Sequence, residues 1–249
     1  MDIWTGGNAA KLYCLDRIAQ LITQRGGRLS IADLGCGDGL HFALLLRAFP
    51  QVRYVGLDPD AAACARAKTA LRGCNADIRT TPVYDVAPTA NERFDVVVSF
   101  SVLEHVYQRP RYLRTCARWL QPGTVMYLNY DAGHFLARLQ GNYPWRERFR
   151  DWRRRWRAMR GNEADYQAFV RENDFRTWLN DAGLAIQEEK FFNLYALKEL
   201  SKAVPKERQD EYLRQWVAYE LSLNSAGVTY TDRMAQWFGT RNFVLTRRD

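Results

Sequence analysis

The residues of this chain best suited to chemistry are a carboxylate and the glycine-rich turn that follows it. Asp33 lies at the end of a short apolar run that begins at Ile31, and glycines follow at positions 35, 37 and 39. Glycine lets the backbone take positive φ and approach a ligand closely, and the amphipathic run Leu40–Phe49 predicts a helix after the turn. The segment therefore predicts a strand, turn and helix that cradle a nucleotide.

One missing glycine and one charge decide between kinds of nucleotide. A dinucleotide-binding fingerprint has a third glycine three residues after the second, but Leu40 occupies that position here. A pyrophosphate close to Asp33 would be repelled by roughly several kcal/mol at an effective dielectric of about 20. An ammonium group would be attracted there instead. The turn therefore favours a ligand with a cationic group over one that presents phosphates.

A second carboxylate and three further motifs follow in order. Tyr54–Asp58 is an apolar run that ends in an acid. Asp58 lies about twenty residues beyond the glycines, the separation at which a carboxylate can accept both ribose hydroxyls. The later motifs are the β-rich run Phe94–Phe100, the loop Ser101–Val106, and the turn Leu120–Gly123 that leads into the apolar run Val125–Asn129.

Over residues 30–130 these motifs resemble those of the class I methyltransferases that use S-adenosylmethionine (SAM). The resemblance implies transfer of the SAM methyl group by in-line displacement, which leaves S-adenosylhomocysteine. It also implies the residues that contact the cofactor. They are Asp33, Gly35, Gly37, Asp58, Pro59, Tyr84, Asp85, Ser99 and Phe100, of which Tyr84 and Asp85 stand in the region that would bind adenine and Asp85 could equally cap a loop.

A general base is needed only where the acceptor atom carries a proton, and the candidates follow the fourth and fifth predicted strands. They are Glu104, His105 and His134, of which His134 is the first choice for a base and the other two have a structural role as their alternative. A related subgroup, the quinone-biosynthesis O-methyltransferases, holds a divalent cation with E-x-x-E-H. Ser101 replaces the first acid here, so we expect no metal. We expect His41 to be a surface or packing residue.

The elements that position these residues alternate between β-rich and helical patterns. Together with the resemblance, this alternation predicts one α/β domain over residues 1–249, with a doubly wound, mostly parallel, seven-stranded sheet of Rossmann-like methyltransferase type. Residues 1–29 predict a helical segment that is either a lid over the cofactor or a helix that covers the sheet. Residues 131–162 and 193–239 are helical insertions that we expect to roof the active site.

Composition favours a cytoplasmic protein. The chain has no uninterrupted apolar run near the roughly 18 residues that cross a bilayer, and its first residues lack the order of a signal peptide. The five cysteines are scattered and include no C-x-x-C pair, which is typical of a reducing compartment and not of a zinc site.

Positive charge is concentrated in one predicted helix, residues 144–160. The chain has a net charge of +8, and residues 143–160 hold eight arginines and two acids. Five apolar residues recur there at steps of four and three and share one stripe: Trp145, Phe149, Trp152, Trp156 and Met159. The stripe either packs on the rest of the protein and leaves a solvated arginine face, or the helix binds an anionic substrate, a partner or membrane surface, or, as the least favoured choice, nucleic acid.

Three functions remain open at this point. The leading hypothesis is a methyltransferase that acts on an oxygen or nitrogen atom of a small molecule, which could be anionic. The alternative is a methyltransferase for RNA or for a membrane lipid of quinone type, docked through the arginine-rich helix. A protein that binds SAM without catalysis is disfavoured because Asp33, Gly35, Gly37 and Asp58 are all present. The sequence does not determine the oligomeric state.

Overall fold

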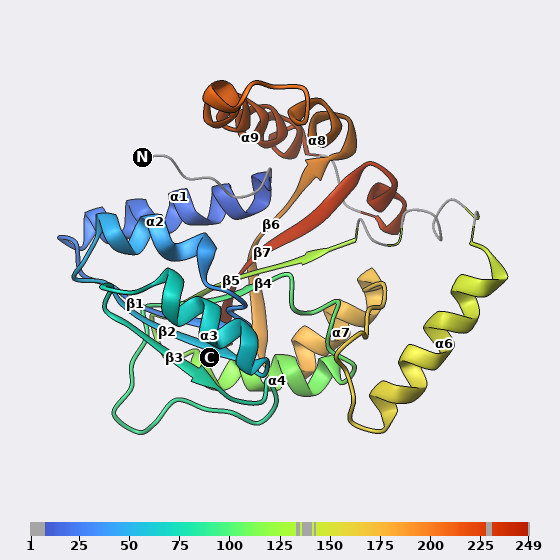
Figure 1. Ribbon diagram of the computed structural model, residues 1–249, viewed down its shortest axis with the longest axis horizontal. Helices are drawn as coiled ribbons and strands as arrows, with labels where there is room; N and C mark the ends of the chain where they lie inside the picture. Colours follow the sequence, from blue (N-terminus) through green and yellow to red (C-terminus); the bar gives the residue numbers. More distant parts are fainter. Residues whose placement is uncertain (1–7, 133–134, 136–140, 142, 228–230, 249) are drawn as a thin grey trace.

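The computed structural model describes residues 8–132, 135, 141, 143–227 and 231–248. Its centre is a seven-stranded sheet in the order β3-β2-β1-β4-β5-β7-β6 (Figure 1). The strands are β1 (Ser30–Leu34), β2 (Arg53–Asp58), β3 (Ala76–Thr80), β4 (Val96–Phe100), β5 (Val125–Asp131), β6 (Leu184–Leu194) and β7 (Phe238–Arg247).

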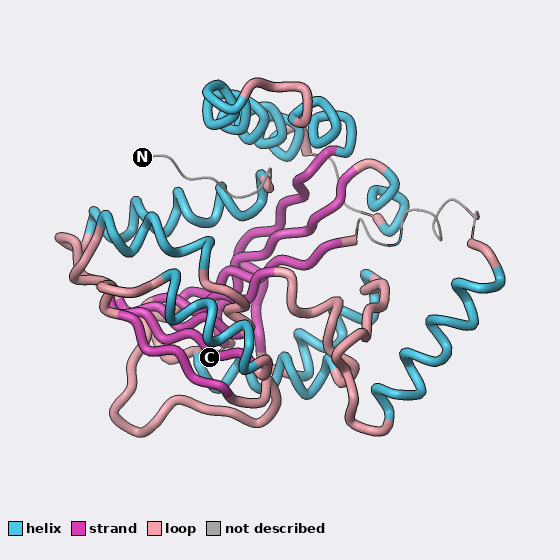
Figure 2. Tube along the Cα trace, in the orientation of Figure 1, coloured by secondary structure: helices cyan, strands magenta, loops and turns pink. Residues whose placement is uncertain are grey.

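Helices connect the strands and lie on both faces of the sheet (Figure 2). The α-helices are α1 (Ala9–Gln24), α2 (Leu40–Ala48), α3 (Ala61–Ala70), α4 (Arg109–Trp119), α6 (Trp145–Met159), α7 (Glu172–Asp181), α8 (Tyr195–Ser201) and α9 (Gln209–Ser225). Two short 3-10 helices are η2 (Lys206–Arg208) and η3 (Asp232–Gln236).

The sheet is parallel except at one edge. Strands β1 to β5 pair in parallel, whereas β7 pairs antiparallel with both β5 and β6. Every residue of β4 is buried, as expected for a parallel strand covered on both faces. The predicted α/β class and the doubly wound, mostly parallel sheet are confirmed.

Alternate side chains of the strands feed two hydrophobic cores. On one face Ile31 and Tyr54 pack with α1, α2, α3 and α9. On the other face Ala32 and Val55 pack with α4 and α7. Asp33, next along β1, therefore shares the face of Ile31 and Tyr54 and points toward the side of the sheet that α1 covers.

The strand order reverses between β1 and β4, because β1 connects toward β2 on one side while β4 continues the sheet on the other. A crevice opens at such a switch point beyond the carboxyl ends of the strands, where ligands bind in open α/β sheets. The glycine turn after β1 and the loop after β4 both begin at this crevice.

The N-terminal helix and the insertion over residues 193–239 meet on one face of the sheet. Helix α1 buries Leu12, Leu15 and Ile18, and α9 packs beside it through Leu213 and Trp216 (Figure 1). The insertion over residues 193–239 thus extends a hydrophobic core together with the N-terminal helix.

Helix α6 begins and ends where the sequence predicts, but its apolar stripe does not pack on the protein. It begins after Pro144 and ends before Gly161, and of its side chains Ala158 is buried. The interpretation that its apolar stripe packs on the protein is wrong, since Trp145 is 72% exposed and Trp152 59%. The helix lies at the periphery of the molecule (Figure 1).

Candidate functional site

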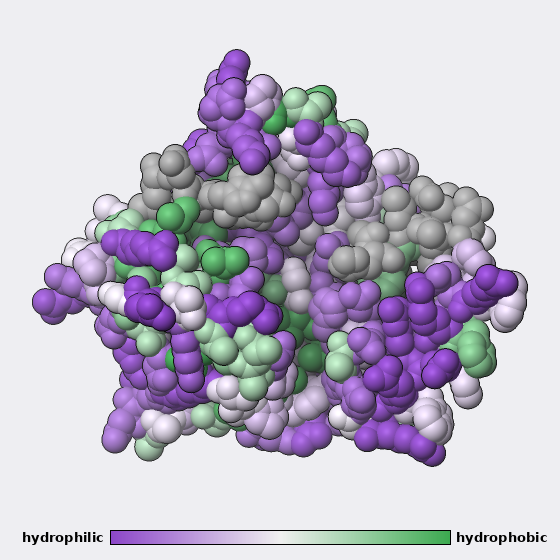
Figure 3. All heavy atoms as spheres, viewed as in Figure 1, coloured by the Kyte–Doolittle hydropathy of each residue, from purple (hydrophilic) through white to green (hydrophobic). Residues whose placement is uncertain are grey.

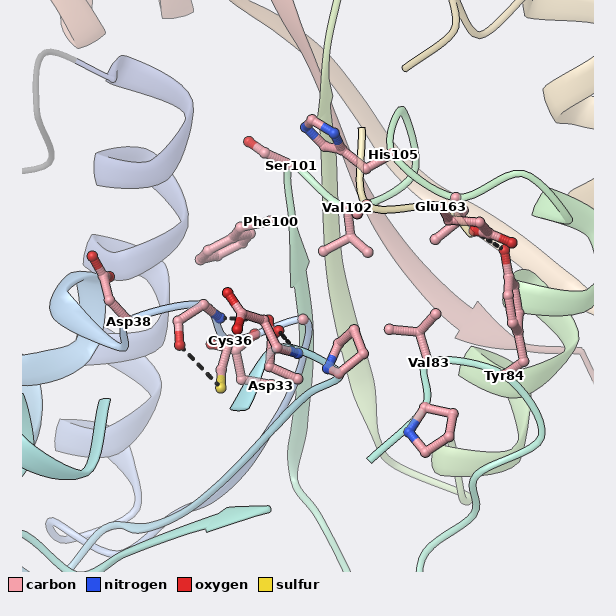
Figure 4. Close-up of a pocket in the computed structure, with 18 of the residues that line it drawn as sticks. Asp33, Cys36, Asp38, Val83, Tyr84, Phe100, Ser101, Val102, His105 and Glu163 are labelled. Atoms are coloured by element: carbon pink, nitrogen blue, oxygen red, sulfur yellow. Dashed lines mark hydrogen bonds between the residues drawn. The ribbon is translucent and has the colours of Figure 1, made fainter. Parts of the chain in front are cut away.

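A cavity of about 1080 Å³ lies at the carboxyl ends of β1, β2 and β4 (Figure 4). Figure 3 shows a hollow near the centre of the molecule with hydrophobic residues at its floor. The predicted site residues that line the cavity are Asp33, Gly35, Gly37, Asp58, Pro59, Tyr84, Phe100 and His105.

Asp33 presents a buried carboxylate to this cavity. The residue is 4% exposed, and its Oδ2 accepts a hydrogen bond of 2.7 Å from the Tyr54 hydroxyl. Its Oδ1 is buried and has no hydrogen-bond partner among the described residues. Burial raises the pKa of Asp33 to about 7, against the lowering effects of Tyr54 and Lys11. A buried oxygen without a partner is costly, so the site is suited to a ligand that donates hydrogen bonds there.

Lys11 and His41 lie at the same cavity, on α1 and α2. The Lys11 Nζ and the His41 Nε2 are 2.7 Å apart, and both residues line the cavity. Burial lowers the pKa of Lys11, while the charge of Asp33 opposes that shift. Burial, followed by the charge of Lys11, lowers the pKa of His41 to about 4. The expectation that His41 is a surface or packing residue is wrong, because it holds a cationic side chain at the cavity.

The glycine turn passes so close to the loop after β4 that a side chain at Gly35 would not fit. At Gly35 φ is 96°, and a Cβ would stand 2.3 Å from Cγ2 of Val102. The amides of Gly35 and Cys36 both donate to the Leu57 carbonyl, at 2.8 and 3.0 Å. The turn is thus tied to the end of β2, and the backbone after β1 is held beside the loop after β4.

Asp58 is oriented by two backbone amides. Its Oδ2 accepts from the Gly37 amide and its Oδ1 from the Asp60 amide, each at 2.9 Å. A carboxylate offers about four acceptor positions, so two remain for a ligand. This arrangement joins the glycine turn to the second strand through the carboxylate itself.

The residues at the end of β4 divide between structure and cavity. Ser99 is fully buried, its Oγ is 2.8 Å from the Tyr112 hydroxyl, and it is not among the residues that line the cavity. Phe100 follows on the cavity side. Ser101 lines the cavity with a φ of 57°, a left-handed conformation that turns the chain sharply away from the strand.

The candidate bases separate in the same way. Glu104 is fully buried behind the cavity, and its Oε1 accepts a 2.9 Å bond from the Asp131 amide. Burial raises the pKa of Glu104 to about 8. His105, the next residue, lines the cavity (Figure 4). His134 lies outside the described residues.

Tyr84 and Asp85, adjacent in sequence, have different surroundings. The Tyr84 hydroxyl lines the cavity and donates to Glu163 at 2.6 Å (Figure 4). Asp85 is not among the cavity residues, and its carboxylate pairs with Arg111 at the surface. The backbone at Asp85 is left-handed, with a φ of 58°, and the guanidinium of Arg111 also lies 5.2 Å from the centre of the Tyr84 ring.

Three residues of the site were missed by sequence reasoning: Lys11 and Glu163 line the cavity, and Tyr54 lies outside the lining but donates to Asp33. Lys11 lies on a helix whose apolar stripe was its only visible signal, and Tyr54 resembles any other strand residue. Glu163, with its neighbours Gly161–Ala164, closes one side of the cavity after α6. Among the described residues, residues 161–162 of the predicted insertion 131–162 line the cavity, and no residue of 193–239 does.

The fold and site define a class. A doubly wound sheet with an antiparallel β7, a glycine turn after β1 and carboxylates at the ends of β1 and β2 are the features of a class I SAM-dependent methyltransferase. The sequence profile of the methyltransferase domain matches residues 8–189, and the chain belongs to this family.

Curated relatives are similar over a large part of the chain. A ubiquinone biosynthesis O-methyltransferase of Xanthomonas axonopodis pv. citri is 27% identical over 178 residues, which cover 70% of this chain and 69% of that protein. The protein of the same name in Xanthomonas campestris pv. campestris is 28% identical over the same shares.

Solved structures share the fold. A SAM-dependent methyltransferase of Clostridium acetobutylicum has a TM-score of 0.58 at 11% identity, covering 94% of this chain and 91% of that one. PKMT2 of Rickettsia typhi, solved with S-adenosylhomocysteine, has a TM-score of 0.53 at 12% identity, covering 89% of this chain and 49% of that one.

SAM is the methyl donor of this family, and two features of the cavity suit it. The buried Oδ1 of Asp33 lacks a donor within the described part of the chain, which a ligand ammonium would supply. The Asp58 carboxylate accepts two backbone amides and keeps acceptor positions for the hydroxyls of a ribose. Within the same part of the chain, no group of His, Cys, Asp and Glu residues has the arrangement of a metal site, and no helix has the length and apolar character to cross a bilayer.

Proposed function

We propose that this protein transfers the methyl group of SAM to an oxygen atom of a small organic acceptor, with His105 as the base that accepts the acceptor's proton. The observation that carries the proposal is the cavity that brings His105 together with Asp33 and Asp58. Similarity to O-methyltransferases supports oxygen as the acceptor atom.

Opposite charges would hold the amino-acid end of the donor. The Asp33 carboxylate would accept hydrogen bonds from its ammonium group, and Lys11 would pair with its carboxylate. Both side chains line the cavity. Hydrogen bonds between ionised groups are stronger than those between neutral groups. When the Lys11 side chain turns from His41 to the ligand, the negative charge of the ligand carboxylate would raise the pKa of Lys11.

The sugar would lie on the second strand. Asp58 already accepts two backbone amides and has acceptor positions left for both ribose hydroxyls. Pro59 follows it at the cavity wall, and Tyr84 lies on the wall formed by the loop after β3. These contacts fix the donor from one end to the other and so set the direction in which the methyl group faces.

When bound, SAM supplies a methyl group activated by its sulfonium. The protein's part is to align the acceptor and exclude water, for which the gain can reach roughly 7–11 kcal/mol. Phe100 and Val102 give the cavity apolar surface near the end of β4. His105, beyond them, is placed to take a proton from an acceptor hydroxyl, a step that typically contributes about 10²–10⁴-fold.

The test combines binding with turnover. Calorimetry would measure SAM binding, and mass spectrometry would follow S-adenosylhomocysteine formed with a panel of phenols and catechols. We expect His105→Asn to bind SAM like the wild type and to lose turnover by about a hundredfold. His134→Asn is the comparison, because it was the first choice from sequence. Full turnover in His105→Asn would show that His105 is not the base. Failure of the wild type to bind SAM would contradict the whole proposal.

A further inference from the structure

Helix α6 exposes an apolar surface that a folded protein ordinarily buries. The aromatic stripe, as we name it, is exposed along its whole length: Trp145 72%, Phe149 54%, Trp152 59%, Trp156 44% and Met159 65%. Exposed apolar patches of this kind mark interaction sites. The stripe is the outward face of the helix, since the buried Ala158 lies on the opposite side.

Arginines border the stripe on both edges. At about 100° per residue, Arg148 and Arg155 fall along one edge, and Arg153 and Arg160 along the other. All four are exposed, and no salt bridge within the described part of the chain joins any of them to a carboxylate. Figure 3 shows hydrophilic side chains gathered over this helix.

The two acids of α6 lie away from the stripe. Glu147 and Asp151 share the side of Ala158 and are only partly exposed. They pair within the helix, Glu147 with Arg150 and Asp151 with Arg154. The outward half of the helix therefore carries aromatic and cationic groups alone, while the negative charges face the protein.

This division fits a phospholipid surface. Tryptophan and phenylalanine insert at the boundary between headgroups and acyl chains, and bordering arginines extend to the phosphates above it. A second copy of the chain would bring two strongly cationic segments together, and double-stranded RNA, whose bases are already stacked, would leave the stripe in water. We propose that α6 docks in the plane of an anionic phospholipid membrane, with the aromatic stripe in the interface and the arginines on the lipid phosphates.

Docking through α6 would bring the cavity to the membrane. The helix ends at Met159, and residues 161–164, which follow its C-cap Arg160, line the cavity. An acceptor dissolved in the bilayer would then be close to the site. The docking itself does not depend on the proposed methyl transfer, so binding and activity can fail separately.

The first experiment measures binding to vesicles. Purified wild-type protein is sedimented with phosphatidylcholine vesicles that contain or lack phosphatidylglycerol. We expect at least tenfold tighter binding to the anionic vesicles, a blue shift of tryptophan fluorescence, and weaker binding as salt is raised. Equal binding to both kinds of vesicle, or none to the anionic ones at low salt, would overturn the proposal.

Two pairs of variants locate the surface. Trp152→Ala/Trp156→Ala should bind anionic vesicles at least tenfold more weakly, whereas Tyr219→Ala/Trp237→Ala, which removes two aromatic residues exposed by 51% and 54% elsewhere, should bind normally. The fold should be kept in both, because the side chains removed are exposed.

Charge is tested with the same net change in two places. Arg148→Gln/Arg153→Gln/Arg155→Gln should weaken vesicle binding at least tenfold, and the matched triple Arg66→Gln/Arg72→Gln/Arg114→Gln should weaken it much less. All six arginines are exposed. Equal losses of vesicle binding in the two triple variants would show that only net charge matters and would overturn α6 as the docking site. A dimer in solution that Trp152→Ala/Trp156→Ala dissociates, or RNA binding that outcompetes the vesicles, would overturn it as well.

Discussion

The hydroxyl of Tyr84 donates a hydrogen bond of 2.6 Å to Glu163, and this bond connects the loop after β3 with the segment after α6. Glu163 also accepts from the Tyr107 amide at 2.9 Å. Tyr84 and Glu163 both line the cavity. The two hydrogen bonds therefore join three stretches of chain, distant in sequence, at one wall of it (Figure 4).

Removing this bond should loosen the wall. In Tyr84→Phe, Glu163 keeps the Tyr107 amide but loses the phenol, and a hydrogen bond to a charged group typically contributes about 1.5–3 kcal/mol. We expect SAM to dissociate several-fold faster in stopped-flow measurements and the melting temperature to fall by a few degrees. Asp85→Asn changes the next residue, outside the cavity, and serves as the control. An unchanged dissociation rate in Tyr84→Phe would show that the wall does not retain the ligand.

Substitution of Asp58 should cost the ribose contacts. Asp58→Ala removes both acceptor oxygens and frees the Gly37 and Asp60 amides. We expect SAM binding to weaken by more than tenfold in calorimetry, because a ribose on this strand would lose both hydrogen bonds. Asp60→Asn, which keeps an acceptor at the start of α3, is the matched control. Unaltered affinity in Asp58→Ala would mean that the ligand lies elsewhere.

Cofactor affinity should depend on the protonation of Asp33. Burial raises the pKa of this carboxyl to about 7, and the Tyr54 hydroxyl partly opposes that rise. An ammonium group needs the ionised form, so affinity should increase as pH rises through 7. Tyr54→Phe should raise the pKa further and weaken binding.

The ratio of the two dissociation constants isolates this effect, since the amino group of the ligand titrates identically in both experiments. We expect the ratio of Tyr54→Phe to wild type to be largest below pH 7 and to shrink above it. A ratio that does not change with pH would indicate that Asp33 is ionised throughout.

Buried Glu104 should make stability fall with pH. Its pKa is raised from 4.5 to about 8 in the folded protein, so the folded state binds the proton more tightly than the unfolded one. The contribution of Glu104 is therefore most favourable below pH 4.5 and is lost as pH rises toward 8. At about 1.4 kcal/mol per pKa unit, the loss is of order 5 kcal/mol.

Urea unfolding across this pH range checks the sign. Relative to Glu104→Gln, the wild type should lose stability as pH rises from 4.5 to 8. Glu92 gives the opposite control: its pKa is lowered to about 2, with the hydrogen bond from Arg79 as the largest cause, so wild type should lose stability relative to Glu92→Gln as pH falls below 4.5. Parallel pH profiles of wild type and Glu104→Gln would contradict the buried, protonated acid.

The sequence determined the elements whose signals are local. Glycines 35, 37 and 39 after an apolar run required the turn after β1, and the alternation of β-rich and helical patterns required the doubly wound sheet. The start and end of α6 were readable from Pro144 and Gly161. Asp33 and Asp58 were placed at the cavity because the carboxyl ends of parallel strands share one edge.

Only the tertiary structure decided which side chains meet. Lys11 faces the cavity of Asp33 because α1 crosses the sheet there, and Asp85 pairs with Arg111 and does not line the cavity as Tyr84 does. Periodicity identified the aromatic stripe of α6 but could not say whether protein covers it. Helical spacing fixes which residues share a face, whereas the neighbour of that face is set by contacts between segments far apart in the chain.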